Sequence, residues 1–253
     1  MTDLTSAVRP VVILEFLASR PGGVTLRQLR DELGIPRSSA WLLVRQLEDG
    51  GFLARLDANT FVAGSRLVRM SLSLYQAASM GGDTRFVLQD LSTATGFDIY
   101  LAVRAGDSVV YADRVFGVNP VQVRRQLGEP RPLHASAGGK LFLAYESDGL
   151  WDRCIEGREL ERFTPATLTD LAALRKQLAQ VKELGYVDAA GEVLTSISSL
   201  GCMAFSADGS PWAAVVISAH ESDLDFRRDE TIAKLVETTK KLSETRAGLD
   251  ARQ

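Results

Sequence analysis

The sequence TLRQLRDELGIPRSSAWLLVRQLEDGGFL, residues 25–53, has the pattern of two short helices around a tight turn. Thr25 and Gln28 form a capping box, in which the two side chains satisfy free backbone amides of the first turn. The apolar positions that follow recur on one helical face, at Leu26, Leu29 and Leu33. Gly34 is expected to end this helix, and Pro36 is expected in the first turn of the next, where proline sacrifices no hydrogen bond.

The second helix is predicted to bury Ala40, Leu43 and Leu47 and to leave its other face free. Its N-terminal half then offers hydroxyls, arginines and an aromatic ring, which suit the major groove of DNA. We therefore predict a helix-turn-helix DNA reader, with an ordinary surface hairpin of helices as the alternative. The candidate DNA-binding residues are Arg27, Arg37, Ser38, Ser39, Trp41, Leu42, Arg45 and Arg55.

The flanking segments complete a winged helix. Residues 52–56 and 60–62 are β-prone and are separated by Asp57-Ala58-Asn59, so they are predicted to form a hairpin that serves as the wing. Upstream, a helix with Pro10 near its first turn is expected to bury the stripe Val8, Val11, Leu14 and Leu17.

Composition and charge favour a protein of about two domains. The chain has 253 residues, 45% of them hydrophobic, and a net charge of -3. Residues 1–80 hold nine arginines against seven acids, whereas the remainder carries 20 basic and 25 acidic residues, so a basic DNA-binding domain is joined to an acidic second domain.

No apolar run reaches the length of a membrane span and no signal-peptide pattern is present, so we expect a cytoplasmic protein. Cys154 and Cys202 are expected to be reduced, and neither a metal site nor a cofactor is predicted.

The rest of the chain predicts a linker helix and a second domain of mixed α/β (α+β) class. We divide the chain into the winged helix-turn-helix (1–64), the linker helix (65–82, ending at Gly81-Gly82) and a larger domain (83–250). Hairpins are expected at 98–103 with 108–111 and at 200–205 with 212–217, and a further strand at 121–123. Helices are expected at 137–146, at 168–184 with Thr167 as the cap, and at 225–246. The second apolar edge of the linker, Leu72 and Tyr75, suits pairing with another chain or packing within its own.

Residues 132–144, PLHASAGGKLFLA, turn through small side chains into a helix. Small residues at a helix start allow a ligand to approach the backbone closely, and the free amides there attract carboxylates. A tight turn that only packs beneath the helix is the equally weighted alternative.

These features, together with Gly185-Tyr186 followed by Glu192, resemble the IclR family of bacterial transcription regulators over essentially the whole chain. The resemblance implies a GAF-like effector-binding domain after the winged helix, and dimers or tetramers that bind double-stranded operator DNA. It maps a pocket for a small molecule onto Val123, Ala135, Ser136, Ala137, Gly138, Asp188 or Ala189, Ile197, Ser199 and Ser218. Trp41 and Leu42 stand where the family frequently has histidine and arginine, so this operator is expected to differ.

We thus expect an IclR-type regulator, repressor or activator, whose operator affinity is modulated by a small organic acid, aromatic acids included. The alternative is a DNA-binding protein whose second domain only oligomerises. An enzyme is disfavoured, because His134 and Ser136 lie too close in sequence to pair readily as base and nucleophile and no Gly-x-Ser-x-Gly elbow is present. Of the adjacent Arg124 and Arg125, only one can face a pocket from a strand.

Overall fold

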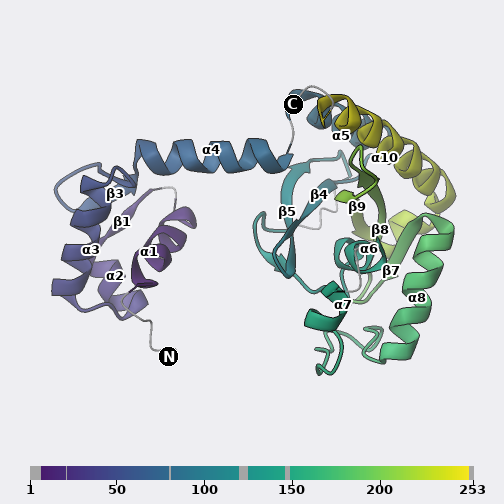
Figure 1. Ribbon diagram of the computed structural model, residues 1–253, viewed down its shortest axis with the longest axis horizontal. Coiled ribbons are helices and arrows are strands. Elements are labelled where there is room, and N and C mark those ends of the chain that lie inside the picture. Colours follow the sequence, from purple (N-terminus) through teal and green to yellow (C-terminus); the bar gives the residue numbers. More distant parts are fainter. Residues whose placement is uncertain (1–6, 21, 80, 120–124, 146–148, 251–253) are drawn as a thin grey trace. The chain divides into compact units, whose positions relative to one another are not determined.

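The computed structural model describes residues 7–20, 22–79, 81–119, 125–145 and 149–250, which divide into two compact units (Figure 1). The units are Met1–Ala77 and Ala78–Gln253, so the boundary falls inside the stretch expected to be the linker. No helix within the described ranges is long and apolar enough to cross a lipid bilayer.

The N-terminal unit contains the predicted helix pair. Thr25 and Gln28 form the capping box, and the second helix of the unit ends at Gly34 in the left-handed conformation, with φ of 65°. Pro36 is the N-cap of the next helix, one position before its expected place, and Val44 rather than Leu43 joins Ala40 and Leu47 in the buried stripe. The helices are α1 (Arg9–Ala18), α2 (Leu26–Leu33), α3 (Arg37–Asp49) and α4 (Ser65–Ser79).

The wing is a three-stranded antiparallel sheet in the order β1-β3-β2. The predicted hairpin is formed by β2 (Leu53–Arg55) and β3 (Thr60–Ala63), and β1 (Val24–Thr25) adds a strand too short to show any periodicity. The stripe expected on α1 was partly wrong, because Ile13 and Leu17 are buried whereas Val11 is exposed. Ile13 and Leu17 lie one helical turn apart on one face, and Val11, two positions before Ile13, points away from it.

The linker helix was expected to end at the glycine pair, and no helix was expected directly after it. α4 ends at Ser79, and a further helix, α5 (Gly81–Thr95), begins at Gly81. Met80, the expected last residue of the linker helix, lies outside the described residues. Packing of α5 against the last helix of the chain overrides the local preference of two glycines for a break.

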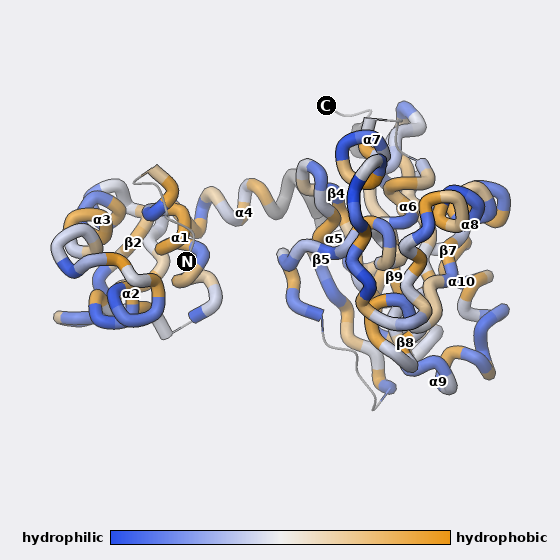
Figure 2. The backbone as a smooth tube through the Cα atoms, turned by 90° about the horizontal axis from the view of Figure 1, so that it is seen from below, coloured by the Kyte–Doolittle hydropathy of each residue, from blue (hydrophilic) through white to orange (hydrophobic). Residues whose placement is uncertain are grey.

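The C-terminal unit is built on a six-stranded antiparallel sheet in the order β6-β5-β4-β9-β8-β7. Helices α6, α7 and α8 cover one face, and α5 and α10 cover the other (Figure 1). Hydrophilic and hydrophobic residues alternate along α8 because only one side of it is buried (Figure 2). The strands are β4 (Ile99–Ala105), β5 (Ser108–Val115), β6 (Pro130–Arg131), β7 (Tyr186–Ala190), β8 (Ile197–Phe205) and β9 (Pro211–His220); the helices are α6 (Ala137–Tyr145), α7 (Gly149–Cys154), α8 (Leu171–Leu184), α9 (Glu221–Asp225) and α10 (Arg228–Asp250).

Two boundaries differ from the predicted ones. α8 is capped by Asp170, whose carboxylate accepts a hydrogen bond from the Ala173 amide, and not by Thr167. Thr167 instead donates to the backbone oxygen of Glu192 at 2.7 Å and so joins two loops. The last predicted helix, 225–246, corresponds to α10, which begins three residues later at Arg228, and the short α9 before it was not predicted. The predicted strand at 121–123 lies outside the described residues.

A buried ion pair ties α6 to the loop that follows β7. The Lys140 side chain is fully buried, and its ammonium donates to Oε1 of Glu192, which is also buried. Gln177 Nε2 of α8 donates to the same oxygen at 3.4 Å, and the Leu168 amide approaches Oε2 at 3.5 Å. Burial lowers the pKa of Lys140, and the Glu192 carboxylate opposes that change. Glu192 thus joins α6, α8 and the loop before α8.

We predict that Lys140→Met destabilises the C-terminal unit by about 3–5 kcal/mol, because it leaves the Glu192 carboxylate buried without its cation. The double variant Lys140→Met with Glu192→Leu should recover much of this loss, since it removes both charges. Calorimetric unfolding of the full chain measures both, with the exposed Lys176→Met on α8 as the control. A double variant as unstable as the sum of the two single variants would contradict the pairing.

Candidate functional site

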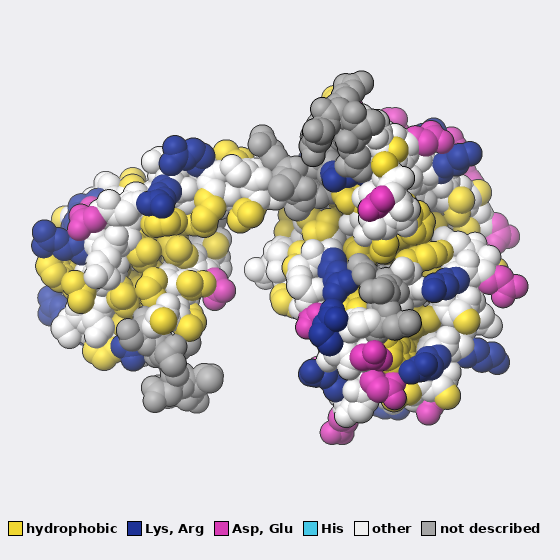
Figure 3. Space-filling view, viewed as in Figure 1, with side chains coloured by type: hydrophobic (Ala, Val, Ile, Leu, Met, Phe, Trp, Pro, Cys, Tyr) yellow, Lys and Arg dark blue, Asp and Glu magenta, His cyan; other side chains and the backbone are white. Residues whose placement is uncertain are grey.

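A hollow of about 680 Å³ opens on the N-terminal unit between α2, α3 and the wing. Its lining is rich in arginine, and the described part of the chain places no carboxylate there. Figure 3 shows Arg side chains, in dark blue, gathered over α3 at the edge of this unit. The lining residues are Thr25, Leu26, Arg27, Arg30, Arg37, Trp41, Arg55, Ala58, Asn59 and Phe61.

The outward face of α3 carries most of the predicted DNA-binding residues. Ser38, Trp41, Leu42 and Arg45 recur at helical spacing and form one exposed stripe, while Ser39 is half-buried. The guanidinium of Arg45 lies 5.3 Å from the centre of the Trp41 ring, within the range of a cation–π contact. Among the described residues no side chain caps the N-terminus of α3, so its first amides can receive a phosphate.

Two further predicted contacts, Arg27 and Arg55, are held by carboxylates of their own unit. Arg55 pairs with Glu48 at 3.1 Å, and its guanidinium lies 4.8 Å from the centre of the Phe61 ring. Arg27 pairs with Asp31 at 3.4 Å. Pairs this exposed contribute little in water, so either arginine can exchange its carboxylate for a phosphate.

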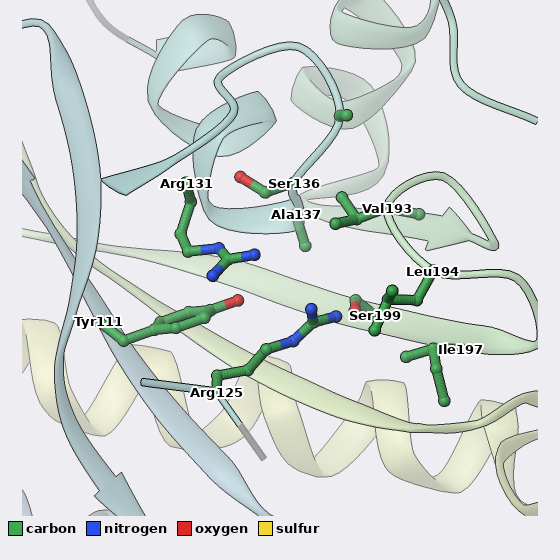
Figure 4. Close-up of a pocket in the computed structure, with 11 residues that line it drawn as sticks. Tyr111, Arg125, Arg131, Ser136, Ala137, Val193, Leu194, Ile197 and Ser199 are labelled. Carbon is green, nitrogen blue, oxygen red and sulfur yellow. The ribbon is translucent and has the colours of Figure 1, made fainter. Parts of the chain in front are cut away.

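A second candidate site is a small enclosed pocket in the C-terminal unit (Figure 4). Its free space is about 10 Å³, which is room for one water molecule. It lies where the start of α6 meets β5, β7 and β8. The lining residues are Tyr111, Arg125, Arg131, Ala135, Ser136, Ala137, Ala189, Val193, Leu194, Ile197 and Ser199.

The pocket carries an excess of positive charge. The guanidiniums of Arg125 and Arg131 extend into it near the Tyr111 hydroxyl (Figure 4), and no carboxylate is among its described lining residues. Arg131 Nη1 donates to Glu129 Oε2 at 3.0 Å, whereas Arg125 Nε is buried without a hydrogen-bond partner in the described structure. Burial lowers the pKa of Arg125. It raises the pKa of Tyr111, which therefore remains a neutral phenol and a hydrogen-bond donor.

Two serines are held in place at the pocket wall. Ser136 Oγ donates to the Pro132 carbonyl at 2.7 Å and accepts from the Gly139 amide at 3.1 Å. Ser199 Oγ lies 2.9 Å from Ser218 Oγ on the neighbouring strand. Because the Ser136 hydroxyl hydrogen is already donated to Pro132, the Ser136 oxygen can only accept from a ligand.

The loop after β7 closes the apolar side of the pocket with Val193 and Leu194. Leu194 is nevertheless half exposed. Ser196 in the same loop has φ of 64°, in the left-handed region that side chains other than glycine rarely adopt. The loop begins at Glu192, so the Lys140–Glu192 pair holds the part of the wall that a larger ligand would have to displace.

The structure sorts the predicted pocket residues into three groups. Ala135, Ser136, Ala137, Ile197 and Ser199 line the pocket, and Ser218 lies behind it, bonded to Ser199. Gly138 faces the sheet, where an added Cβ would lie 3.0 Å from Ala102 Cβ. Val123 lies outside the described residues.

Asp188 does not line the pocket, which corrects the prediction. Side chains alternate along β7, so Ala189, the alternative at this place, faces the pocket and Asp188 faces α10. There the Asp188 carboxylate pairs with Arg228. Sequence reasoning also missed Tyr111, Arg131, Val193 and Leu194, and left Arg125 undecided between two neighbours. The alternation of side chains along the predicted strand 108–111 was the signal that could have placed Tyr111 on the pocket face of the sheet.

His134 and Ser136 do not form a catalytic pair. His134 Nε2 lies 2.8 Å from the Glu161 backbone oxygen, and its ring stacks on Phe163 at 5.8 Å. Ser136 donates its hydroxyl to a backbone carbonyl. Both side chains are used to hold the loop before α6.

Two family profiles match the chain. The profile for the bacterial transcriptional regulator IclR C-terminal region matches residues 77–244, and that for the IclR helix-turn-helix domain matches residues 6–57. The transcriptional repressor IclR of Escherichia coli K12 is 25% identical over 251 residues, covering 98% of this chain and 92% of its own. The probable transcriptional regulator SauR of Cupriavidus necator is 28% identical over 179 residues, covering 70% of this chain and 71% of its own.

Solved structures show the same fold. The IclR protein of Thermotoga maritima superposes with a TM-score of 0.73 and 25% identity, covering 94% of this chain and 98% of its own. An IclR homologue from Microbacterium hydrocarbonoxydans, solved in complex with 4-hydroxybenzoate, gives a TM-score of 0.80 at 23% identity. The match covers 95% of this chain and 98% of the homologue. With both profiles matched and both units accounted for, the chain belongs to the IclR family of DNA-binding bacterial transcription regulators.

Proposed function

We propose that this regulator binds its operator through α3 and the wing, and that a small organic acid bound at Arg125 and Arg131 controls its affinity for DNA. The observation that carries the ligand assignment is the buried, unpartnered Nε of Arg125 beside a second guanidinium. A buried cationic donor without a partner is unfavourable, and a bound carboxylate would satisfy it.

The pocket chemistry favours a single carboxylate on a small body. Glu129 already pairs with Arg131, which leaves the charge of Arg125 for the ligand. Tyr111, Ser136 and Ser199 offer hydroxyls around that position, and Val193, Leu194 and Ile197 offer apolar surface on the other side. Because the free space is about 10 Å³, an acid of ring size has to displace Leu194 and its loop. A homologue with 4-hydroxybenzoate bound supports aromatic acids as candidates.

Strand β7 offers a route from the pocket to the opposite face of the sheet. Ala189 lines the pocket, while the adjacent Asp188 pairs with Arg228 at the start of α10. α10 packs against α5, and α5 begins two residues after α4 ends. A ligand that shifts β7 would therefore change the packing of the helix next to the linker. A coupling of about 1–3 kcal/mol is the usual size of such an effect.

We propose that the chain acts as a homodimer, alone or paired into tetramers. Hydrophobic side chains are exposed along α4 (Figure 3), at Val68, Met70, Leu72 and Leu74. Beside them lies an apolar groove of about 500 Å³ lined by residues that include Leu17, Val62 and Leu67. A second copy that covers this surface would place two readers on successive major grooves, about 34 Å apart or a multiple of it.

We predict that Arg37→Ala and Arg45→Ala each weaken binding to DNA from upstream of the protein's own gene. A lost phosphate contact should lower the slope of log K against log salt concentration by about one. Fluorescence anisotropy at several salt concentrations measures both quantities, with the exposed Arg153→Ala of the C-terminal unit as the control. Unchanged binding in both variants would refute the assignment of α3 as the recognition helix.

We predict that acetate, pyruvate, benzoate or 4-hydroxybenzoate raises the melting temperature of the protein, since ligand binding stabilises the folded state by mass action. Arg125→Met should abolish that rise without changing operator affinity in the absence of acid, whereas Arg158→Met should keep it. A rise that survives in Arg125→Met, or an equal rise with benzamide, would contradict the carboxylate assignment. No rise with any acid tested would favour a second domain that only oligomerises.

We predict that Leu72→Glu combined with Leu74→Glu converts the protein to monomers, because two charges would then have to be buried in the dimer contact. Light scattering after size exclusion measures the mass, and Phe226→Glu, at an apolar side chain of the C-terminal unit that is more exposed than Leu72 or Leu74, is the control. A dimer that persists in the α4 variant would place the contact elsewhere.

A further inference from the structure

The recognition helix has an unusual chemistry on the face that is free to meet DNA. Trp41 is 50% exposed and Leu42 is 51% exposed, and both stand in the middle of the stripe from Ser38 to Arg45. Neither side chain belongs to the hydrophobic core of the N-terminal unit. Two large apolar side chains thus remain in water on the one helix that the fold presents to a polyanion.

The surroundings of these two side chains favour DNA as their partner. Trp41 lines the hollow together with Arg27, Arg37 and Arg55, and Arg45 lies over its ring. A protein partner would have to bury this group of guanidiniums, which is costly unless each is paired. A duplex supplies phosphates for the arginines at the edges of the groove and base edges for the centre of the helix.

The major groove contains one apolar group, the 5-methyl of thymine. We propose that Trp41 and Leu42 recognise thymine methyl groups, so that the operator half-site is specified by apolar contact with T·A pairs beside the position read by Arg45. This inference rests on the proposed role of α3 as the recognition helix. It concerns which bases the helix selects, and it can be wrong while that role is right.

The stacked pair of Trp41 and Arg45 makes the contact specific. The cation–π contact restrains the indole and the guanidinium together, which reduces the ordering that DNA binding requires. Arg45 follows Trp41 by one helical turn, so its guanidinium is presented to a base or phosphate adjacent to the thymine. Leu42, the next residue around the helix, reaches a second position of the half-site.

The test uses the full-length protein and an operator selected from a random duplex library. Each thymine of the selected site is replaced in turn by deoxyuridine, which keeps the base pair and removes only the methyl group. Dissociation constants are measured at one salt concentration for the wild type, Trp41→Ala and Leu42→Ala. Phe226→Ala serves as the matched control, since it removes exposed apolar surface from the C-terminal unit.

The wild type should lose about fourfold in affinity at one or two thymines of each half-site, the effect of uncovering one methyl group. At the thymine that Trp41 contacts, uracil substitution should no longer change the affinity of Trp41→Ala. At the thymine that Leu42 contacts, it should no longer change the affinity of Leu42→Ala. Phe226→Ala should keep the wild-type profile.

The inference would be overturned if no uracil substitution changed the affinity of the wild type. It would also be overturned if Trp41→Ala and Leu42→Ala lost affinity at the same uracil positions as the wild type. Conversion of Trp41→Ala to a monomer with an unchanged profile would also overturn it, in favour of a protein contact. Failure of the recognition-helix assignment is separately visible, because Arg37→Ala and Arg45→Ala would then bind the selected duplex as tightly as the wild type.

Discussion

The buried pair of Lys140 and Glu192 holds the walls of the proposed effector pocket. Lys140 stands in the first turn of α6, directly after the small residues that line the pocket, and Glu192 begins the loop that closes it. Through Glu192 the loop is also joined to α8 and, by Thr164 and Thr167, to the segment before α8. A single buried pair therefore fixes two walls of the cavity. Removing either partner alone would leave an unpaired charge in the core.

The alternation of side chains along β7 gives the sheet a second function. One face of the strand contributes Ala189 to the pocket, and the other directs Asp188 to Arg228 at the start of α10. Neighbouring residues thus connect the ligand side of the sheet with the side that carries α5 and α10. In the proposed mechanism a ligand would not have to contact the DNA-binding unit, because a shift of β7 would change the packing of α10 and α5.

The N-terminal unit was largely predictable because its signals are local. The capping box at Thr25, the left-handed Gly34 and the apolar spacing along α3 each lie within one or two helical turns. The mixed α/β class and the two hairpins of the second unit were likewise indicated by turn residues between β-prone runs. α5 was missed because two glycines suggest a break, whereas tertiary packing against α10 keeps the segment helical.

The pocket was predictable only in part. The loop before α6 was identified from its small residues, but Tyr111, Arg125 and Arg131 come from the opposite side of the cavity. These side chains meet in one cavity because of how β5 and β6 pair, and no local sequence pattern predicts that pairing. Asp188 was misplaced for the same reason, since a shift of one residue along a strand reverses the face. The positive charge of the proposed ligand site thus follows from the topology of the sheet.

In the proposed mechanism, binding of the acid and binding of the operator are linked through this protein. The most direct measurement takes the acid that raises the melting temperature most and determines its dissociation constant on the free protein and on the operator complex. The two constants should differ by about 5- to 150-fold, and by the same factor by which the acid changes operator affinity. Equal affinity of the acid for the free protein and the complex would show that the pocket does not control DNA binding.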